Sequence, residues 1–181
     1  MKGVSCIKYN INGVKTYEFT KIVGLDKITF GKNIIIDDFT LIYATAPIKI
    51  GNYSHIASFT SISGGAELTL DDYVAVSQGC RILMGSDDFV DWGFGNSTVN
   101  SKYRNLKRKP VKIGKFCIIG ANSVVLPGVK IGEGATVGAG SVVTKDLDRW
   151  GVYINNKRIK ERNKEGVLTN YENFLREQEN E

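Results

Sequence analysis

Residues 113–143 read IGKFCI IGANSV VLPGVK IGEGAT VGAGSV V, with an aliphatic residue at the head of each group of six. A six-residue period differs from the 3.6-residue period of a helix and from the two-residue period of an isolated strand. It is the period of a hexapeptide β-helix, in which each repeat supplies one short strand and one corner. We therefore predict a mainly β solenoid. Its anchors in this stretch are Ile113, Ile119, Val125, Ile131, Val137 and Val143.

The same register extends toward the N-terminus. Further anchors stand at Phe30, Ile36, Ile42, Ile50, Ile56, Ile62, Leu70, Val76 and Ile82. A two-residue insertion recurs after every third of these, so three repeats make one triangular coil of a parallel β-helix. The pattern predicts about five coils, which at a strand spacing of ~4.8 Å form a prism roughly 24 Å tall. Small residues four positions after the later anchors are expected to point into the corners: Cys117, Ser123, Val129, Ala135 and Ser141.

Residues directly before the anchors should point outward and stack in columns from coil to coil. One column reads Ile35, His55, Ala75, Ile118 and Thr136. Another reads Leu41, Ser61, Arg81, Val124 and Val142. Exposed apolar columns on a rigid prism mark an interface with another molecule.

Both ends of the solenoid are expected to be covered. Val4 to Ile11 and Val14 to Phe19 alternate apolar and polar around Asn12-Gly13, which predicts a hairpin cap. Near the other end, Thr169 followed by Glu172 is a capping-box pattern and predicts a short helix, packed on the coil or on a partner subunit. The expected division is a cap over residues 1–27, the β-helix over 28–147 and a C-terminal segment over 148–181.

A long loop interrupts the register between Ile82 and Ile113, which lie 25 residues further apart than the period requires. We expect the loop to be extruded over residues 87–112. Long loops on a rigid scaffold are usually functional or disordered. This one is predicted to be ordered and to contact a neighbouring subunit, because it carries Phe89, Trp92, Phe94 and Tyr103.

Composition narrows the class of protein. The net charge of +5 comes without aromatic-interleaved basic motifs, so no nucleic-acid partner is expected, and a phosphate-bearing small ligand fits better. No apolar run approaches the roughly 20 residues of a membrane span, and residues 1–20 have no apolar core of a signal peptide. Cys6, Cys80 and Cys117 lack metal-ligand spacing. We read them as thiols of a reducing compartment, and predict a cytoplasmic protein without a metal.

The repeats, above all Ile119-Gly120-Ala121-Asn122, resemble those of the hexapeptide-repeat acyltransferases. The resemblance covers residues 28–162 and implies a left-handed β-helix, whereas the general rule for parallel crossovers would give a right-handed one. It also implies a homotrimer whose active sites lie in the grooves between prisms. The implied reaction transfers an acyl group from a coenzyme A thioester, here acetyl-CoA, to a sugar hydroxyl or amine.

The resemblance also implies roles for individual residues. In the Gly120-Ala121 pair, the backbone N–H of Ala121 would donate to the thioester oxyanion. One coil further on, Gly138 and Ala139 would line the pantetheine arm. The nucleotide phosphates of the cofactor would be met by Lys145, with Lys157 or Arg158.

The proton acceptor departs from the family pattern. Many sugar and antibiotic acetyltransferases of this family place a catalytic histidine where the long loop leaves the coil. Here that place reads MGSDDF, residues 84–89, without a histidine. The chain's one histidine, His55, lies in an outward column, and it is either the general base or an interface residue.

Asp87 and Asp88 are the other catalytic candidates. A carboxylate with a pKa of about 4 is a poor base for a sugar hydroxyl, but it is suited to hold a sugar ammonium group and take its proton. The alternative is that the two aspartates cap a turn. The loop pattern is also similar to that of acyltransferases acting on nucleotide-linked aminodeoxysugars and on surface-polysaccharide sugars. In that reading the substrate is bound by Ser86, Trp92, Tyr103 and Arg104.

The prediction from sequence is an acetyl-CoA-dependent N-acetyltransferase that acts on a nucleotide-linked aminodeoxysugar in surface-polysaccharide biosynthesis. The main alternative is an O-acetyltransferase acting on a polysaccharide or galactoside hydroxyl. A non-catalytic β-helix is the third possibility. A γ-type carbonic anhydrase shares the β-helix but needs three zinc-binding histidines, and a single histidine excludes it.

Overall fold

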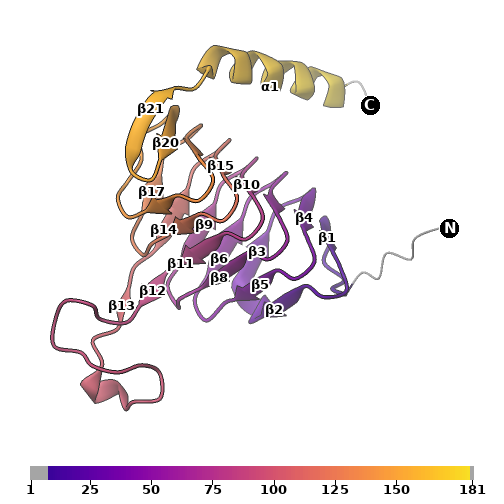
Figure 1. Ribbon diagram of the computed structural model, residues 1–181. Coiled ribbons are helices and arrows are strands. Elements are labelled where there is room, and N and C mark those ends of the chain that lie inside the picture. The colour runs from indigo at the N-terminus through magenta and orange to yellow at the C-terminus, as the bar shows by residue number, and fades with distance from the viewer. Residues whose placement is uncertain (1–7, 180–181) are drawn as a thin grey trace.

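A computed structural model describes residues 8–179 of the chain. In Figure 1 the strands stack into a parallel β-helix with three sheets, which form the faces of a triangular prism. The chain visits the faces in a fixed order, from the first to the second to the third and back to the first. Each face is one parallel ladder, so equivalent residues of successive coils lie directly beside one another.

Each face is built from two- to four-residue strands. The first face contains β1 (Val14–Thr16), β4 (Ile34–Ile36), β7 (His55–Ile56), β10 (Ala75–Val76), β15 (Ile118–Ile119), β18 (Thr136–Val137) and β20 (Gly151–Ile154). The second contains β2 (Lys21–Val23), β5 (Leu41–Tyr43), β8 (Ser61–Ser63), β11 (Arg81–Leu83), β16 (Val124–Val125) and β19 (Val142–Val143). The third contains β3 (Ile28–Phe30), β6 (Ile48–Ile50), β9 (Leu68–Leu70), β14 (Val111–Ile113) and β17 (Lys130–Ile131).

Three corners connect the three faces, and the candidate site residues lie at or near them. The first corner joins the first face to the second and comprises residues 37–40, 57–60, 77–80, 120–123 and 138–141. The second corner joins the second face to the third, and the long loop leaves from it after β11. The third corner joins the third face back to the first.

The core follows the predicted period. All fifteen predicted anchors are buried except Phe30, which is half-buried near the open end of the prism. The small residues predicted for the corners are buried as well, from Cys117 to Ser141. Both predicted outward columns are confirmed by the strand register. His55 pairs with Ile35 and Ala75 in the first column, and Ser61 pairs with Leu41 and Arg81 in the second. Fully burying one such aliphatic side chain contributes about 1.5–3 kcal/mol, so the repeated anchors are the main source of stability.

The number of coils was underestimated. The first face has seven parallel strands in the described chain, against the five coils expected. β1 and β2 already run parallel to β4 and β5, and β20 runs parallel to β18, so the β-helix extends from Val14 to Ile154 and not from 28 to 147. The aliphatic pattern is broken at the first-face anchor of each end coil, although Ile22 in the first coil keeps it. Thr16 and Tyr153 fill anchor positions with buried side chains that are not aliphatic.

The predicted N-terminal hairpin is only partly present as such. Val14 N–H donates to the Ile11 carbonyl at 3.1 Å, which confirms the turn at Asn12-Gly13. The second strand of the predicted hairpin is, however, β1 of the prism. Residues 4–7 of the first strand lie outside the described residues. Tyr9 covers the first coil, where its hydroxyl accepts a 2.8 Å hydrogen bond from Ile22 N–H.

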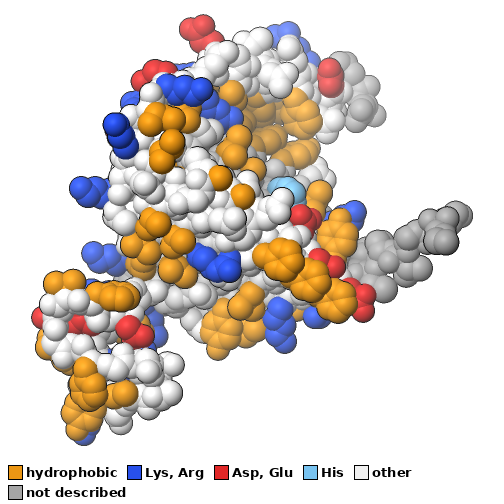
Figure 2. All heavy atoms as spheres, in the orientation of Figure 1, with side chains coloured by type: hydrophobic (Ala, Val, Ile, Leu, Met, Phe, Trp, Pro, Cys, Tyr) orange, Lys and Arg blue, Asp and Glu red, His pale blue; other side chains and the backbone are white. Residues whose placement is uncertain are grey.

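The long loop forms an arm that projects from the second corner (Figure 1). Its base is a short antiparallel pair, β12 (Gly85–Ser86) with β13 (Lys107–Arg108), and a 3-10 helix, η2 (Ser101–Tyr103), lies further out. Hydrophobic side chains gather on the surface of this arm (Figure 2). They include Phe89, which is 90% exposed, and Trp92, which is 62% exposed.

The C-terminal segment covers the third corner. β21 (Lys157–Glu161) folds back antiparallel on β20, and α1 (Lys164–Gln178) follows. Two of its aromatic side chains, Tyr171 and Phe174, pack on the ring of Tyr73 at centroid distances of 5.2 and 6.2 Å. The predicted helix is confirmed, but it begins earlier than the Thr169 signal implied. In the described chain, no helix has the length and apolar character needed to cross a membrane.

The earlier start of the helix has a local cause. The side chain of Asn163 accepts a 2.9 Å hydrogen bond from the N–H of Gly166, which satisfies one of the free donors of the first turn. Asn163 is therefore the N-cap, and the Thr169–Glu172 pattern falls inside the helix.

Candidate functional site

The first corner presents unpaired backbone N–H groups. Gly120 N–H donates to the Val137 carbonyl at 2.8 Å, and Gly138 N–H donates to the Tyr153 carbonyl at 2.7 Å. The next N–H groups along the chain, those of Ala121 and Ala139, have no acceptor in the part of the chain that the structure describes. They repeat one coil apart along the same edge, so the corner offers a row of donors to a ligand that carries oxygen atoms.

Gly120 keeps this edge open. A Cβ atom on Gly120 would lie 2.5 Å from the backbone nitrogen of Ala139 and 2.6 Å from the carbonyl oxygen of Val137. Both distances are too short for real contacts, so no side chain fits between these coils. Gly138 has more room, since its nearest neighbour would be the Tyr153 carbonyl oxygen at 3.2 Å. The four residues implicated by the repeats, Gly120, Ala121, Gly138 and Ala139, therefore lie together.

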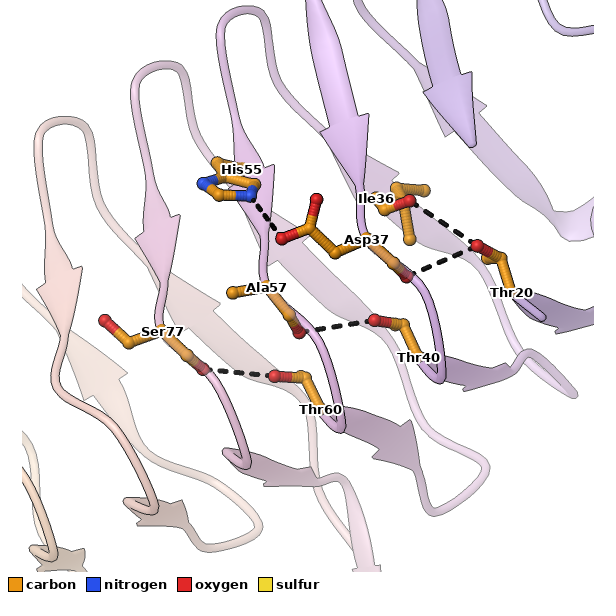
Figure 3. A network of polar contacts seen from close by, with 8 residues as sticks. All are labelled: Thr20, Ile36, Asp37, Thr40, His55, Ala57, Thr60 and Ser77. Atoms are coloured by element: carbon orange, nitrogen blue, oxygen red, sulfur yellow. Dashed lines mark hydrogen bonds and ion pairs between the residues drawn. The ribbon is translucent and has the colours of Figure 1, made fainter. Parts of the chain in front are cut away.

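His55 is paired with a carboxylate that the sequence did not single out. Its Nε2 lies 3.0 Å from Oδ2 of Asp37, which is the residue after the first-face strand β4 (Figure 3). The His55 side chain is 48% exposed, and the histidine is visible at the surface in Figure 2. When Nε2–H donates to the carboxylate, Nδ1 is left free to accept a proton. Asp37 stands in the same corner column as Gly120 and Gly138.

Asp37 could have been found from the register. The anchors Ile36 and Ile56 are partners in adjacent strands, so residues 37 and 55 flank them on neighbouring coils. Their separation along the chain is nearly one full turn of the prism, which hides the pair from any search for short motifs.

Asp87 lies at the base of the arm, at the second corner. Its Oδ1 accepts a 2.7 Å hydrogen bond from Nη2 of Arg104, and Ser86 Oγ donates to its carbonyl at 2.9 Å. The Arg104 side chain is largely buried, while that of Asp87 is 40% exposed. A hollow of about 430 Å³ opens here, lined in part by Gly64, Gly65, Ser86, Asp87 and Arg108. Three of the predicted site residues, Ser86, Asp87 and Arg104, are thus brought together.

Asp88 has a different environment. Its carboxylate accepts hydrogen bonds from the N–H groups of Val90, Asp91 and Gly93 and from the Asn105 amide, at 2.9–3.1 Å. Desolvation raises the pKa of Asp88, but these four hydrogen bonds outweigh it and hold the pKa well below its usual range. Asp88 therefore caps the turns of the arm, as the alternative reading allowed. Its low pKa works against a role as proton acceptor.

The catalytic candidates do not meet within one chain. His55 and Asp37 lie along the first face and first corner, whereas Asp87 and Asp88 lie at the second corner, on another edge of the prism. The remaining predicted substrate-binding residues, Trp92 and Tyr103, lie further out on the arm and are exposed.

The predicted phosphate-binding residues lie at the C-terminal end of the prism. Asn156 Oδ1 accepts hydrogen bonds from the N–H groups of Thr144 and Lys145 at 2.9 and 3.2 Å. This brings Lys145 next to Lys157, which lines a shallow groove of about 770 Å³ with Ile154, Asn155 and Asn156. The guanidinium of Arg158 is instead paired with Glu161 at 2.5 Å. Among residues 8–179, no cluster of three His, Cys, Asp or Glu side chains could hold a metal ion.

Comparison with known proteins agrees with this geometry. Residues 110–145 match the family "Bacterial transferase hexapeptide (six repeats)". The chain is 37% identical over 154 residues to an Escherichia coli protein named dTDP-4-amino-4,6-dideoxy-D-glucose acyltransferase, with 83% of this chain and 80% of that protein covered. The chain belongs to the hexapeptide-repeat acyltransferases.

Solved structures extend this result. This hexapeptide-repeat acyltransferase superposes on AntD, an N-acyltransferase from Bacillus cereus in complex with dTDP and 3-hydroxybutyryl-CoA, with a TM-score of 0.86 and 33% identity over 92% of this chain and 89% of AntD. A mutant of AntD in complex with dTDP-4-amino-4,6-dideoxyglucose and coenzyme A gives a TM-score of 0.85. A maltose O-acetyltransferase from Clostridium difficile 630, 20% identical with a TM-score of 0.54 over 83% of this chain and 67% of that one, shares the fold.

Proposed function

We propose that this protein is an acyl-CoA-dependent N-acyltransferase that acts on the amino group of a nucleotide-linked aminodeoxysugar. The observation that carries the proposal is the 37% identity, over most of both chains, to the E. coli acyltransferase whose name specifies such a sugar. The AntD structures, which contain dTDP-linked aminosugar and coenzyme A ligands, support the same substrate class.

The first corner supplies what the acyl donor needs. The N–H groups of Ala121 and Ala139 are free and point at successive positions along one edge, which suits an extended pantetheine arm and the thioester oxygen. An N–H group aimed at the developing oxyanion lowers the barrier, since it is already oriented when charge develops. Lys157 follows the last strand of the first face and Lys145 follows β19 at the second corner. Both lie at the C-terminal end of the prism, joined through Asn156, and we propose that they meet the phosphates of coenzyme A.

Asp87 is the proposed partner of the amine. The carboxylate holds the sugar ammonium group and takes one proton from it, and the neutral nitrogen then attacks the thioester carbonyl carbon. The C–S bond breaks, the amide forms, and the thiolate leaves with a proton as free coenzyme A. The solved AntD variants change one serine and one aspartate that lie ten residues apart in AntD. Ser77 and Asp87 lie ten residues apart in this chain. Ser77 lies at the first corner, one coil before Gly120.

O-acylation is the second candidate, and the pairing of His55 with Asp37 favours it. A histidine with a carboxylate partner is a suitable general base for a sugar hydroxyl, which does not lose its proton unaided. The His55–Asp37 pair would not be needed for N-acylation, because a neutral amine attacks the thioester without a general base.

Acceptor preference distinguishes the two candidates. We expect release of free thiol from acetyl-CoA with dTDP-4-amino-4,6-dideoxyglucose as acceptor, and at least a hundredfold less with the matched dTDP-sugar that carries a hydroxyl at the same carbon. Turnover should survive the His55→Asn substitution, because an amine needs no such base. Preference for the hydroxyl sugar, or for a simple galactoside, would refute N-acylation and make His55 the base.

We also propose an acyl group, a pathway and a compartment for the reaction. Acetyl is the proposed acyl group, and 3-hydroxybutyryl-CoA, the ligand of AntD, is the comparison to run beside it. A nucleotide-linked product suits surface-polysaccharide biosynthesis. We propose the cytoplasm as the compartment, because nucleotide-linked sugars and coenzyme A are available there.

We propose a homotrimer in which the first corner of one prism faces the arm of its neighbour. Such packing would bring the free N–H groups and Asp87 into one groove, although they lie on different edges of a single chain. The outward columns supply apolar contact surface, since Ile35 and Ile118 are about 40% exposed. The exposed Phe89 and Trp92 of the arm supply more.

Light scattering after size-exclusion chromatography tests the trimer. The wild-type protein should have three times the 20.0 kDa mass of the chain. Ile118→Glu, which puts a charge in the middle of the first-face column, should give monomers with unchanged circular dichroism. Thr136→Glu is the matched control, because Thr136 is the neighbour of Ile118 in the same column and already carries a polar side chain, and the variant should stay trimeric. A monomeric wild-type protein would rule out the shared groove.

A further inference from the structure

The first corner is lined on its inner side by a ladder of small polar side chains. Thr40 Oγ1 donates to the carbonyl of Ala57 at 3.2 Å, and Thr60 Oγ1 donates to the carbonyl of Ser77 at 3.1 Å (Figure 3). In the next coil a thiol takes the place of the hydroxyl, and Cys80 Sγ lies 3.2 Å from the carbonyl oxygen of Gly120.

The ladder continues into the last coils. Ser123 Oγ donates to the carbonyl of Gly138 at 3.2 Å, and Ser141 Oγ donates to the same oxygen at 2.6 Å. Cys80 and Ser123 are fully buried, so the carbonyl oxygens of Gly120 and Gly138 are turned toward the interior of the prism.

The direction of each carbonyl fixes the direction of the following N–H group. A trans peptide unit is planar, and its C=O and N–H bonds point opposite ways. No cis peptide bond occurs in the described chain. Because the Gly120 and Gly138 oxygens face inward, the N–H groups of Ala121 and Ala139 face outward into the groove.

We propose that Cys80 and Ser123 are positioning residues for acyl transfer. Their hydrogen bonds hold the Gly120–Ala121 and Gly138–Ala139 peptide units so that the two N–H groups stay aimed at the acyl-CoA thioester and its pantetheine amide. The inference rests on the proposed function for the identity of the ligand. It assigns a role to side chains that never touch that ligand.

The peptide units need such a restraint because each begins with glycine. Glycine has no Cβ and accepts many backbone angles, so a peptide plane that follows it rotates more easily than others. A rotated plane would place a carbonyl oxygen in the groove, where it would repel the developing oxyanion. Burial raises the pKa of the Cys80 thiol, so the thiol keeps the proton that it donates.

Cys80 is the better residue to test, because the carbonyl of Gly120 has this one side-chain donor, whereas that of Gly138 has two. Cys80→Ala removes the donor, and Cys80→Ser retains one. Thr40→Ala is the matched control, since it removes an equivalent bond to Ala57, two coils before Gly120. Steady-state kinetics should be measured on all three variants with the trimeric enzyme, together with the melting temperature.

Cys80→Ala should lower kcat about tenfold with KM for acyl-CoA changed less than threefold, since the lost orientation matters most in the transition state. Cys80→Ser should recover most of kcat. Thr40→Ala should reduce the melting temperature by a similar amount and leave kcat unchanged. A merely structural role for Cys80 would instead make the two alanine variants alike in kcat.

A second readout does not depend on turnover. The ¹⁵N–¹H resonance of Ala121 should shift when coenzyme A is added to the wild-type protein and to Cys80→Ser, and shift far less in Cys80→Ala. Wild-type kcat together with a wild-type response of the Ala121 resonance in Cys80→Ala would overturn the proposal. If the wild-type enzyme turned over no amino sugar, the proposed acceptor would be refuted, and the Ala121 resonance would still decide the role of Cys80.

Discussion

Asp87→Asn should lower kcat/KM for the amino sugar about a hundredfold while the protein stays folded. General acid–base groups typically contribute 10²- to 10⁴-fold, and the amide can neither take a proton from the sugar ammonium group nor attract its charge. The remaining amide oxygen can still accept the hydrogen bond from Arg104, so the base of the arm should be retained. Steady-state kinetics with acetyl-CoA and the dTDP-linked amino sugar measures the effect.

Asp88→Asn is the control for a purely structural loss. Its new NH₂ group would face the N–H groups of Val90, Asp91 and Gly93, or the Asn105 amide, and part of the turn would open. Amide exchange of these residues should therefore accelerate in Asp88→Asn and remain unchanged in Asp87→Asn. Full turnover by Asp87→Asn would exclude a catalytic role for this carboxylate.

Gly120→Ala should both destabilise the fold and abolish coenzyme A binding. The added methyl group would meet backbone atoms of the next coil at 2.5 and 2.6 Å, and backbone cannot move aside as a flexible side chain does. Overpacking of this kind costs about 3 kcal/mol of unfolding free energy. The methyl group would also lie over the nitrogen of Ala139 and cover its N–H group. Chemical denaturation and calorimetric titration with coenzyme A measure the two effects.

Gly138→Ala provides the matched comparison one coil away. Its methyl group would lie 3.2 Å from the Tyr153 carbonyl oxygen and 3.3 Å from a side-chain carbon of Ile154. Small adjustments relieve such contacts, so the loss of stability should be about 1 kcal/mol or less. Equal losses in the two variants, or wild-type coenzyme A affinity in Gly120→Ala, would contradict this account of the corner.

The six-residue period predicted the fold closely because one aliphatic side chain per repeat has to fill the same place in every coil. That place also sets which residues face outward, so the columns through His55 and Arg81 followed from it. The period failed where the chemistry of the anchor changed, at Thr16 and Tyr153, and the β-helix was therefore predicted too short.

The site was less accessible to sequence reasoning. The resemblance of the repeats to the hexapeptide-repeat acyltransferases implied Ala121 as a donor and Ala139 as a residue lining the pantetheine arm. The hydrogen-bond partners of individual side chains could not be predicted from the sequence in this way. His55 meets Asp37 on the neighbouring coil. Asp88 differs from Asp87 in its partners, which are N–H groups of the arm and not the Arg104 guanidinium. The arm has no period, so nothing in its sequence paired Asp87 with Arg104.

The arm leaves and returns at one point of the scaffold. Gly85 and Arg108 are direct partners across the antiparallel pair of β12 and β13, so the twenty-odd residues between them enter and leave the prism side by side. An insertion or deletion between β12 and β13 therefore leaves the register of the coils unchanged. The arm can therefore change in length or sequence while the stacking of the coils, and with it the row of N–H groups at the first corner, is left intact.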